Sequence, residues 1–168
     1  MKDKRQLRID AHEVYCRNLA EQAINLIYSA CTVSGQATPV KCHVDYRLTG
    51  ATLSYRKIQT VDLEVKTVSP QYATKGSPLK VAKYYNMLKD HKNQILLLLS
   101  VEDDGTAYIY NLSKINLEQQ AKKETWTIKE IEYQDDNKTK RVATPMFLIP
   151  KELAAYKLTL KTKTKCQP

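Results

Sequence analysis

The segment from Gln94 to Val101 is an almost unbroken run of apolar residues, with Ile95 followed by four leucines. A short run of this kind is typical of a β-strand that is buried on both faces, because a half-exposed strand would alternate apolar and polar residues. Both faces of the sheet that contains this strand must therefore be covered. The sequence predicts a mixed α/β fold in which helices flank a central mixed β-sheet.

The first predicted element is a helix over residues 10–30. Asp10 is the predicted N-cap, and Glu13 stands at the third helical position, where its carboxylate can reach back to a free backbone N–H group. Apolar residues recur at helical spacing and form one stripe that should pack on the sheet. The stripe consists of Leu19, Ala20, Ala23, Ile24 and Ile27.

Three strands in a meander should follow the helix, since apolar and polar residues alternate over residues 40–46, 48–55 and 58–68. The next predicted elements are a short strand at 79–81 and a short helix at 84–91. In that helix, Tyr85 and Leu88 are the residues expected to point inward.

The C-terminal third is predicted to be richer in β-structure. Residues 102–105 form a strong hairpin turn, so the buried run should return as a strand over residues 106–111. A helical turn within 112–120 precedes a second hairpin, whose strands are expected at 125–133 and 140–148. A last helix should begin around Pro150. No composition shift marks a domain boundary, so residues 1–168 are predicted to form a single domain.

The chain carries a formal net charge of +9, with 27 Lys and Arg against 18 Asp and Glu. Such an excess favours a polyanionic partner, and DNA is the simplest one, although part of it lies near the termini. No apolar run approaches the length of a membrane helix, and no signal peptide is evident. The four cysteines, Cys16, Cys31, Cys42 and Cys166, show no paired spacing. These features predict a cytoplasmic protein without a membrane partner.

Residues 61–67 alternate in a way typical of a strand, which places Glu64 and Lys66 on one face. Asp45 lies 19 residues upstream, in another alternating stretch. Carboxylates and an ammonium group that converge in this way can hold a divalent cation and an attacking water. Asp62 falls on the same face as Glu64. It is therefore either an alternative second acid or a surface charge.

The pattern Asp45…Glu64-x-Lys66 resembles the PD-(D/E)XK nuclease superfamily, whose members include restriction enzymes, homing endonucleases and Holliday-junction resolvases. The resemblance implies a restriction-endonuclease-like core of a helix, a three-stranded meander, a helix and a further strand. That core would cover about residues 10–112, and residues 113–168 would form a C-terminal extension with a β-hairpin and a helix. One departure is that no proline precedes Asp45.

The resemblance also implies roles for individual residues. Asp45 and Glu64 would bind Mg²⁺, or alternatively Mn²⁺, together with the backbone carbonyl of Val65. Lys66 would orient or deprotonate the attacking water. Glu21 is the predicted carboxylate from the first helix, and Glu13 is the alternative.

The implied function is that of a Mg²⁺-dependent DNA endonuclease that hydrolyses phosphodiester bonds. Cutting both strands with one active site per chain favours a homodimer or a larger homo-oligomer. Two other interpretations stay open. A Glu-x-Lys pair on a strand is also typical of a solvated polar face, and the same fold could serve a non-catalytic protein that binds nucleic acid or another partner.

Overall fold

A computed structural model of the chain describes residues 4–27, 34–37, 44–49, 61–90, 95–131 and 139–162. A long helix, α1 (Lys4–Ile27), precedes a mixed sheet. The strands of this sheet lie in the order β1-β2-β3-β5-β6-β9. Their bounds are β1 (Ser34–Ala37), β2 (Tyr46–Thr49), β3 (Val61–Val68), β5 (Ile95–Glu102), β6 (Thr106–Asn111) and β9 (Tyr156–Thr159).

The other strands form a second, antiparallel sheet in the order β4-β8-β7. It consists of β4 (Ser77–Lys80), β7 (Lys122–Ile131) and β8 (Thr139–Ile149). The remaining helices are short. They are α2 (Pro70–Ala73), α3 (Val81–Asp90), α4 (Leu117–Gln120) and the 3₁₀-helix η1 (Lys151–Leu153).

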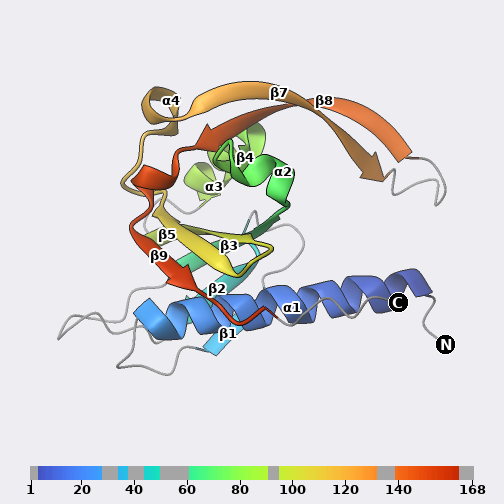
Figure 1. Ribbon diagram of the computed structural model, residues 1–168, viewed down its shortest axis with the longest axis vertical. Helices are drawn as coiled ribbons and strands as arrows, with labels where there is room; N and C mark the ends of the chain where they lie inside the picture. The colour runs from blue at the N-terminus through green and yellow to red at the C-terminus, as the bar shows by residue number, and fades with distance from the viewer. Residues whose placement is uncertain are drawn as a thin grey trace.

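These elements form layers (Figure 1). Helix α1 lies along one face of the first sheet, and α2, α3 and the second sheet lie over the other face. Pairing within the first sheet is antiparallel except between β3 and β5, which run parallel. The chain crosses from β3 to β5 through α2, β4 and α3, as a parallel pair requires. The predicted mixed α/β architecture is therefore confirmed.

Strand β5 is buried on both faces, as its sequence predicts. Leu97 and Leu99 belong to the core against α1, whereas Leu96 and Leu98 belong to the core against α3 and the second sheet. The predicted stripe of α1 is confirmed as well, because Leu19, Ala20, Ala23 and Ile24 are buried and Ile27 packs beside them.

The second sheet is joined to the first by a buried hydrogen bond between the hydroxyl groups of Ser77 and Tyr110, 2.8 Å apart. Gly76, just before β4, has a φ of 109°. A Cβ at this position would lie 2.6 Å from the carbonyl oxygen of Ile149, so only glycine lets β4 approach β8 so closely.

Several expected boundaries were wrong. Helix α1 begins at Lys4, so Asp10 lies inside the helix and does not cap it. The preceding residues include good helix formers and no glycine or proline, which lets the helix extend upstream. In α3 the buried residues are Tyr84 and Met87, whereas Tyr85 is 46% exposed.

The strand predictions were mixed. Strand β2 continues through Arg47, where the sequence suggested a break between strands, and β1 lies upstream of the expected range. The rest of the predicted strands at 40–46, 48–55 and 58–68 lies partly outside the described residues. The hairpin turn at 102–105 is confirmed, since the N–H of Gly105 donates to the carbonyl of Glu102 at 3.0 Å.

The predicted C-terminal helix is wrong. A 3₁₀-turn at Lys151–Leu153 is followed by β9, which pairs antiparallel with β6. Strand β6 would otherwise be an edge of the sheet, with backbone groups free to pair. Gly105 allows this docking, because a Cβ there would lie 2.5 Å from the carbonyl oxygen of Leu160.

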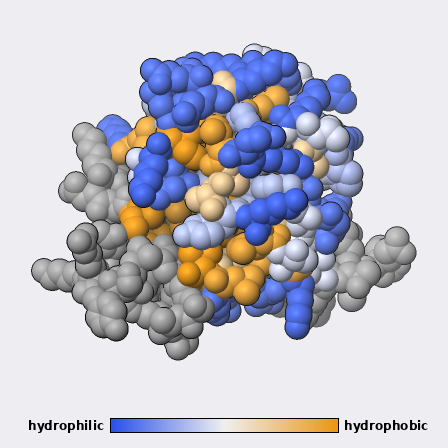
Figure 2. Space-filling model, turned by 60° about the vertical axis from the view of Figure 1, so that its left-hand side comes forward, coloured by the Kyte–Doolittle hydropathy of each residue, from blue (hydrophilic) through white to orange (hydrophobic). Residues whose placement is uncertain are grey.

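The second predicted hairpin is confirmed as β7 and β8, which pair from Lys122↔Leu148 to Ile131↔Thr139. Only the β8 end of this hairpin, near Leu148, also pairs with β4, so the rest is a two-stranded arm that arches over the molecule (Figure 1). Figure 2 shows a mostly hydrophilic surface across the top of the molecule. None of the described helices combines the length and the hydrophobicity that crossing a bilayer requires.

Candidate active site

Asp45 stands immediately before β2 and is held against β3 by two hydrogen bonds. Its N–H donates to the carbonyl of Leu63 at 3.1 Å, and its Oδ2 accepts from the N–H of Val65 at 2.8 Å. The pairing Tyr46↔Leu63 places Asp45 opposite Glu64. Opposite residues of antiparallel strands share a face, so these two carboxylates lie on the same side of the sheet.

Glu64 is fully buried, with 0% of its side chain exposed. Its Oε1 forms ion pairs with the ammonium groups of both Lys66 and Lys83. Its Oε2 accepts no hydrogen bond from any described residue. The two lysines keep contact with solvent, with 34% and 25% of their side chains exposed. The site is thus a buried carboxylate beneath two ammonium groups that open to water.

The electrostatics of the site follow from this arrangement. Burial raises the pKa of Glu64, and Asp45 raises it further, while Lys66 and Lys83 act in the opposite direction. Burial lowers the pKa of Lys66, but the carboxylate of Glu64 more than offsets this, so the pKa lies above its usual value. Asp45 also raises the pKa of Lys66, which places Lys66 under the influence of both carboxylates.

Lys83 was missed by the sequence analysis. It lies in the first turn of α3, four residues before the fully buried Met87. Residues four apart share a helix face, so Lys83 occupies a position of α3 that faces the sheet. A lysine where the helical spacing calls for an apolar residue is the signal that could have identified it.

Asp62 is not a surface charge. It is fully buried and is bound by the guanidinium of Arg47, whose Nε and Nη2 donate to the two carboxylate oxygens at 2.9 and 3.3 Å. A bidentate pair of this kind fixes β2 against β3. Its position next to the Asp45–Glu64 pair makes it a structural support for the site.

Cys16 packs against the core on the α1 face of the sheet, yet the charges of the site reach it. The pKa of the Cys16 thiol is raised to about 11. Burial is the largest cause, and the charges of Asp45 and Glu64 raise it as well. The Sγ of Cys16 lies 3.6 Å from Nε2 of His12. Nearby, the hydroxyl of Tyr46 donates to the backbone carbonyl of Glu13 at 3.3 Å, which ties α1 to β2 beside Asp45.

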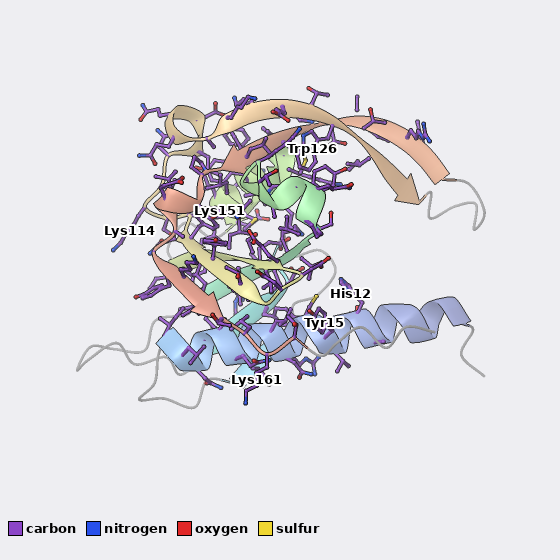
Figure 3. All side chains as sticks on the ribbon, in the orientation of Figure 1. His12, Tyr15, Lys114, Trp126, Lys151 and Lys161 are labelled. Atoms are coloured by element: carbon purple, nitrogen blue, oxygen red, sulfur yellow. The ribbon has the colours of Figure 1, made fainter. Side chains whose placement is uncertain are left out.

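Glu21 lies elsewhere. It lines a hollow at the surface with Tyr15, Gln22 and Lys161. Figure 3 shows Lys161 on the far side of α1, whereas His12 projects from the side toward the sheet. Each helical residue turns the chain by about 100°, so Glu21 stands about half a turn around from His12. Glu13 was the alternative to Glu21 as the carboxylate from the first helix. Of the two, Glu13 is the one whose charge contributes to the raised pKa of Cys16.

Asp45 and Glu64 are the two carboxylates of the site that could hold a hard divalent cation. Among the described residues, no three His, Cys, Asp or Glu side chains group closely enough to hold a metal ion. Mg²⁺ is typically bound through only one or two carboxylates, with waters and substrate phosphates completing its shell. Asp45 and Glu64 supply two carboxylates on one face, and the unpartnered Oε2 of Glu64 is a buried acceptor suited to such an ion.

The three residues of the Asp…Glu-x-Lys pattern therefore lie at one place on the sheet, with Lys83 as an additional member. Comparison of the chain with protein-family models, curated proteins and solved structures finds no match. The chemistry of the site has to be inferred from its own geometry.

Proposed function

We propose that the protein is a metal-dependent endonuclease that hydrolyses phosphodiester bonds in DNA, with Mg²⁺ or Mn²⁺ as the cofactor. The observation that carries the proposal is the arrangement of Asp45, Glu64 and Lys66. Asp45 and Glu64 stand opposite each other in the pairing of β2 with β3. Lys66 lies on the same side of the sheet and is ion-paired with Glu64.

The order of elements also supports a restriction-endonuclease-like core. A helix, three antiparallel strands, a helix and a strand parallel to the third follow one another as α1, β1–β3, α3 and β5. This is the order that the resemblance to PD-(D/E)XK nucleases implies. Asp45 stands at the start of the second strand of this meander, and Glu64 and Lys66 lie within the third.

Each residue has a chemical task in this proposal. Asp45 and Glu64 would hold the cation, which would supply Lewis acidity and offset charge on the phosphate. The hydrogen bond from the N–H of Val65 fixes the Asp45 carboxylate in position. Lys66 is an ammonium group beside Glu64 with its pKa above the usual value, so it orients the attacking water and offsets negative charge on the phosphate.

The charge of the chain and the shape of the fold suit DNA as the substrate. A net charge of +9 attracts a polyanion. The β7–β8 arm and α1 both extend past the first sheet on the same side in Figure 1. Lys140 and Arg141 are exposed on the arm. A two-stranded ribbon of this kind can enter the major groove, so the arm is the surface we assign to DNA contacts.

Incubation of the purified protein with supercoiled plasmid and Mg²⁺ tests the proposal. We expect nicked and linear products with the wild-type protein, and none with EDTA or with Lys66→Ala. Lys89→Ala is the matched control, since Lys89 is an exposed lysine at the end of α3 and should leave cleavage unchanged. Binding of the plasmid without any Mg²⁺- or Mn²⁺-dependent cleavage would favour the non-catalytic alternative.

Cys16 offers a test of cation binding that does not require activity. Because its pKa is raised to about 11, we expect alkylation by iodoacetamide at pH 8 to be slower than for an unfolded-state thiol. A cation at Asp45 and Glu64 offsets two of the charges that raise this pKa. Addition of Mg²⁺ should therefore accelerate alkylation of Cys16 several-fold, as measured by peptide mass spectrometry.

The control for this measurement is the double variant Asp45→Asn/Glu64→Gln, in which Mg²⁺ should not change the rate at Cys16. If Mg²⁺ and Mn²⁺ left the alkylation rate of the wild-type protein unchanged, no cation would be bound beside these carboxylates.

A further inference from the structure

We propose that Lys83 binds the phosphate of the DNA substrate in the candidate active site. This assignment rests on the proposed function and adds to it a residue from α3, outside the Asp…Glu-x-Lys pattern. Lys83 reaches the site from the helix that covers this face of the sheet, and its ammonium group contacts the same oxygen of Glu64 as Lys66 does.

The position of Lys83 is fixed by its neighbours on α3. Tyr84 is buried, its hydroxyl donates to the carbonyl of Ile115 at 3.3 Å, and its ring meets Phe147 edge-on at 5.4 Å. Met87, one turn along, is fully buried. These contacts hold α3 so that the aliphatic part of Lys83 lies between helix and sheet, with its ammonium group at Glu64.

A second ammonium group exceeds what Glu64 needs for neutralisation. Lys66 already pairs with Glu64, and one ammonium group balances one carboxylate. Asp45, Glu64, Lys66 and Lys83 together carry two negative and two positive formal charges. A divalent cation bound there would balance the two carboxylates and leave the charge of both lysines uncompensated. The cluster would then carry an excess of two positive charges, which suits a phosphate that gains negative charge during hydrolysis.

The two lysines differ in a way that separates their roles. Lys66 comes from the same strand as Glu64 and is the lysine of the Asp45…Glu64-x-Lys66 pattern. Lys83 approaches Glu64 from α3, and both lysines keep part of their side chains exposed, 34% for Lys66 and 25% for Lys83. We therefore assign the water to Lys66, the lysine of the strand pattern, and the entering phosphate to Lys83, the lysine that α3 adds.

The test compares Lys83→Met, Lys83→Arg and the control Lys89→Ala in binding to a fluorescein-labelled DNA duplex, with Ca²⁺ in place of Mg²⁺. Lys83→Met should weaken binding about tenfold, because a charge-assisted contact to a phosphate is lost. The slope of log affinity against log salt should become shallower by about one. Lys83→Arg should restore both quantities, since it keeps the charge, and Lys89→Ala should change neither by more than a small amount.

A purely structural role of Lys83, as a counter-ion for Glu64, makes a different prediction. Thermal unfolding of Lys83→Met would then move to lower temperature, while DNA affinity and the salt slope of the folded protein stayed as in the wild type. That result would overturn the assignment even if the wild-type protein cuts plasmid. Conversely, if the wild-type protein does not cut plasmid but Lys83→Met shows the expected loss of affinity and slope, phosphate binding by Lys83 stands and the nuclease proposal fails.

Discussion

Replacement of Asp45 by asparagine is expected to lower the rate of DNA cleavage about 10²- to 10³-fold, since a catalytic metal ion is worth several kcal/mol. Asparagine keeps the shape of the side chain and an oxygen that can accept from the N–H of Val65, so the local fold should survive. What is lost is the negative charge that holds the cation. Single-turnover cleavage of a labelled duplex measures the effect.

DNA binding by the same variant should be retained or strengthened, because the carboxylates of the empty site repel phosphate and one of these charges is removed. Asp62→Asn is the matched control. Asp62 lies on the same face of β3 as Glu64 but is bound by Arg47. Loss of the Asp62 charge should therefore affect stability more than cleavage. Cleavage at the normal rate by Asp45→Asn would show that Asp45 is not the metal ligand. Asp62 would then have to be tested as the metal ligand.

The second large effect concerns stability. Lys66→Met and Lys83→Met together should lower the free energy of unfolding at pH 7 by about 3–5 kcal/mol, because they leave a fully buried carboxylate without a counter-ion. Each single variant should cost less, since the other ammonium group still contacts Oε1 of Glu64. Urea denaturation of the two single variants and the double variant measures these differences.

The direction of the pH dependence follows from the raised pKa of Glu64. In the folded double variant, Glu64 stays protonated to a higher pH than in the unfolded chain. Its favourable contribution is therefore present at low pH and is lost as the pH rises through the folded-state pKa. The loss of stability relative to wild type should be smaller at pH 5 than at pH 7.

Adding Glu64→Gln to the double variant should restore most of the stability at pH 7, because no buried charge remains. A double variant as stable as the wild type at pH 7 would mean that Glu64 does not depend on the lysines for its burial. The control substitution Lys89→Met, at an exposed position of α3, should leave the free energy of unfolding nearly unchanged.

Local pattern predicted much of the fold. The uninterrupted apolar run of β5 and the alternation of β3 identify their strands because burial on two faces or on one leaves a direct trace in the sequence. The turn at Glu102–Gly105 follows from its glycine, whose φ of 88° other residues adopt rarely. The spacing of Glu64 and Lys66 placed them on one face, and the ion pair between them agrees with this.

Elements that depend on a distant partner were not predictable in the same way. The segment at Tyr156–Thr159 is a strand because β6 offers a free edge, and only the folded sheet creates that edge. Tyr84 and Met87 are buried and Tyr85 is exposed, against expectation, because the direction in which α3 faces is set by its packing on β8 and β5. For the same reason Glu21, chosen for its closeness to the apolar stripe of α1, lies beside Lys161 and away from Asp45.

The sequence by itself determined strand β3 and the shared face of Glu64 and Lys66, because a strand's alternation is a local property of the chain. The tertiary structure decided that Glu64 is fully buried, that Arg47 binds Asp62 and that Lys83 joins the cluster from α3. These features arise where residues far apart in sequence meet, since burial and charge pairing depend on what the rest of the fold brings into contact.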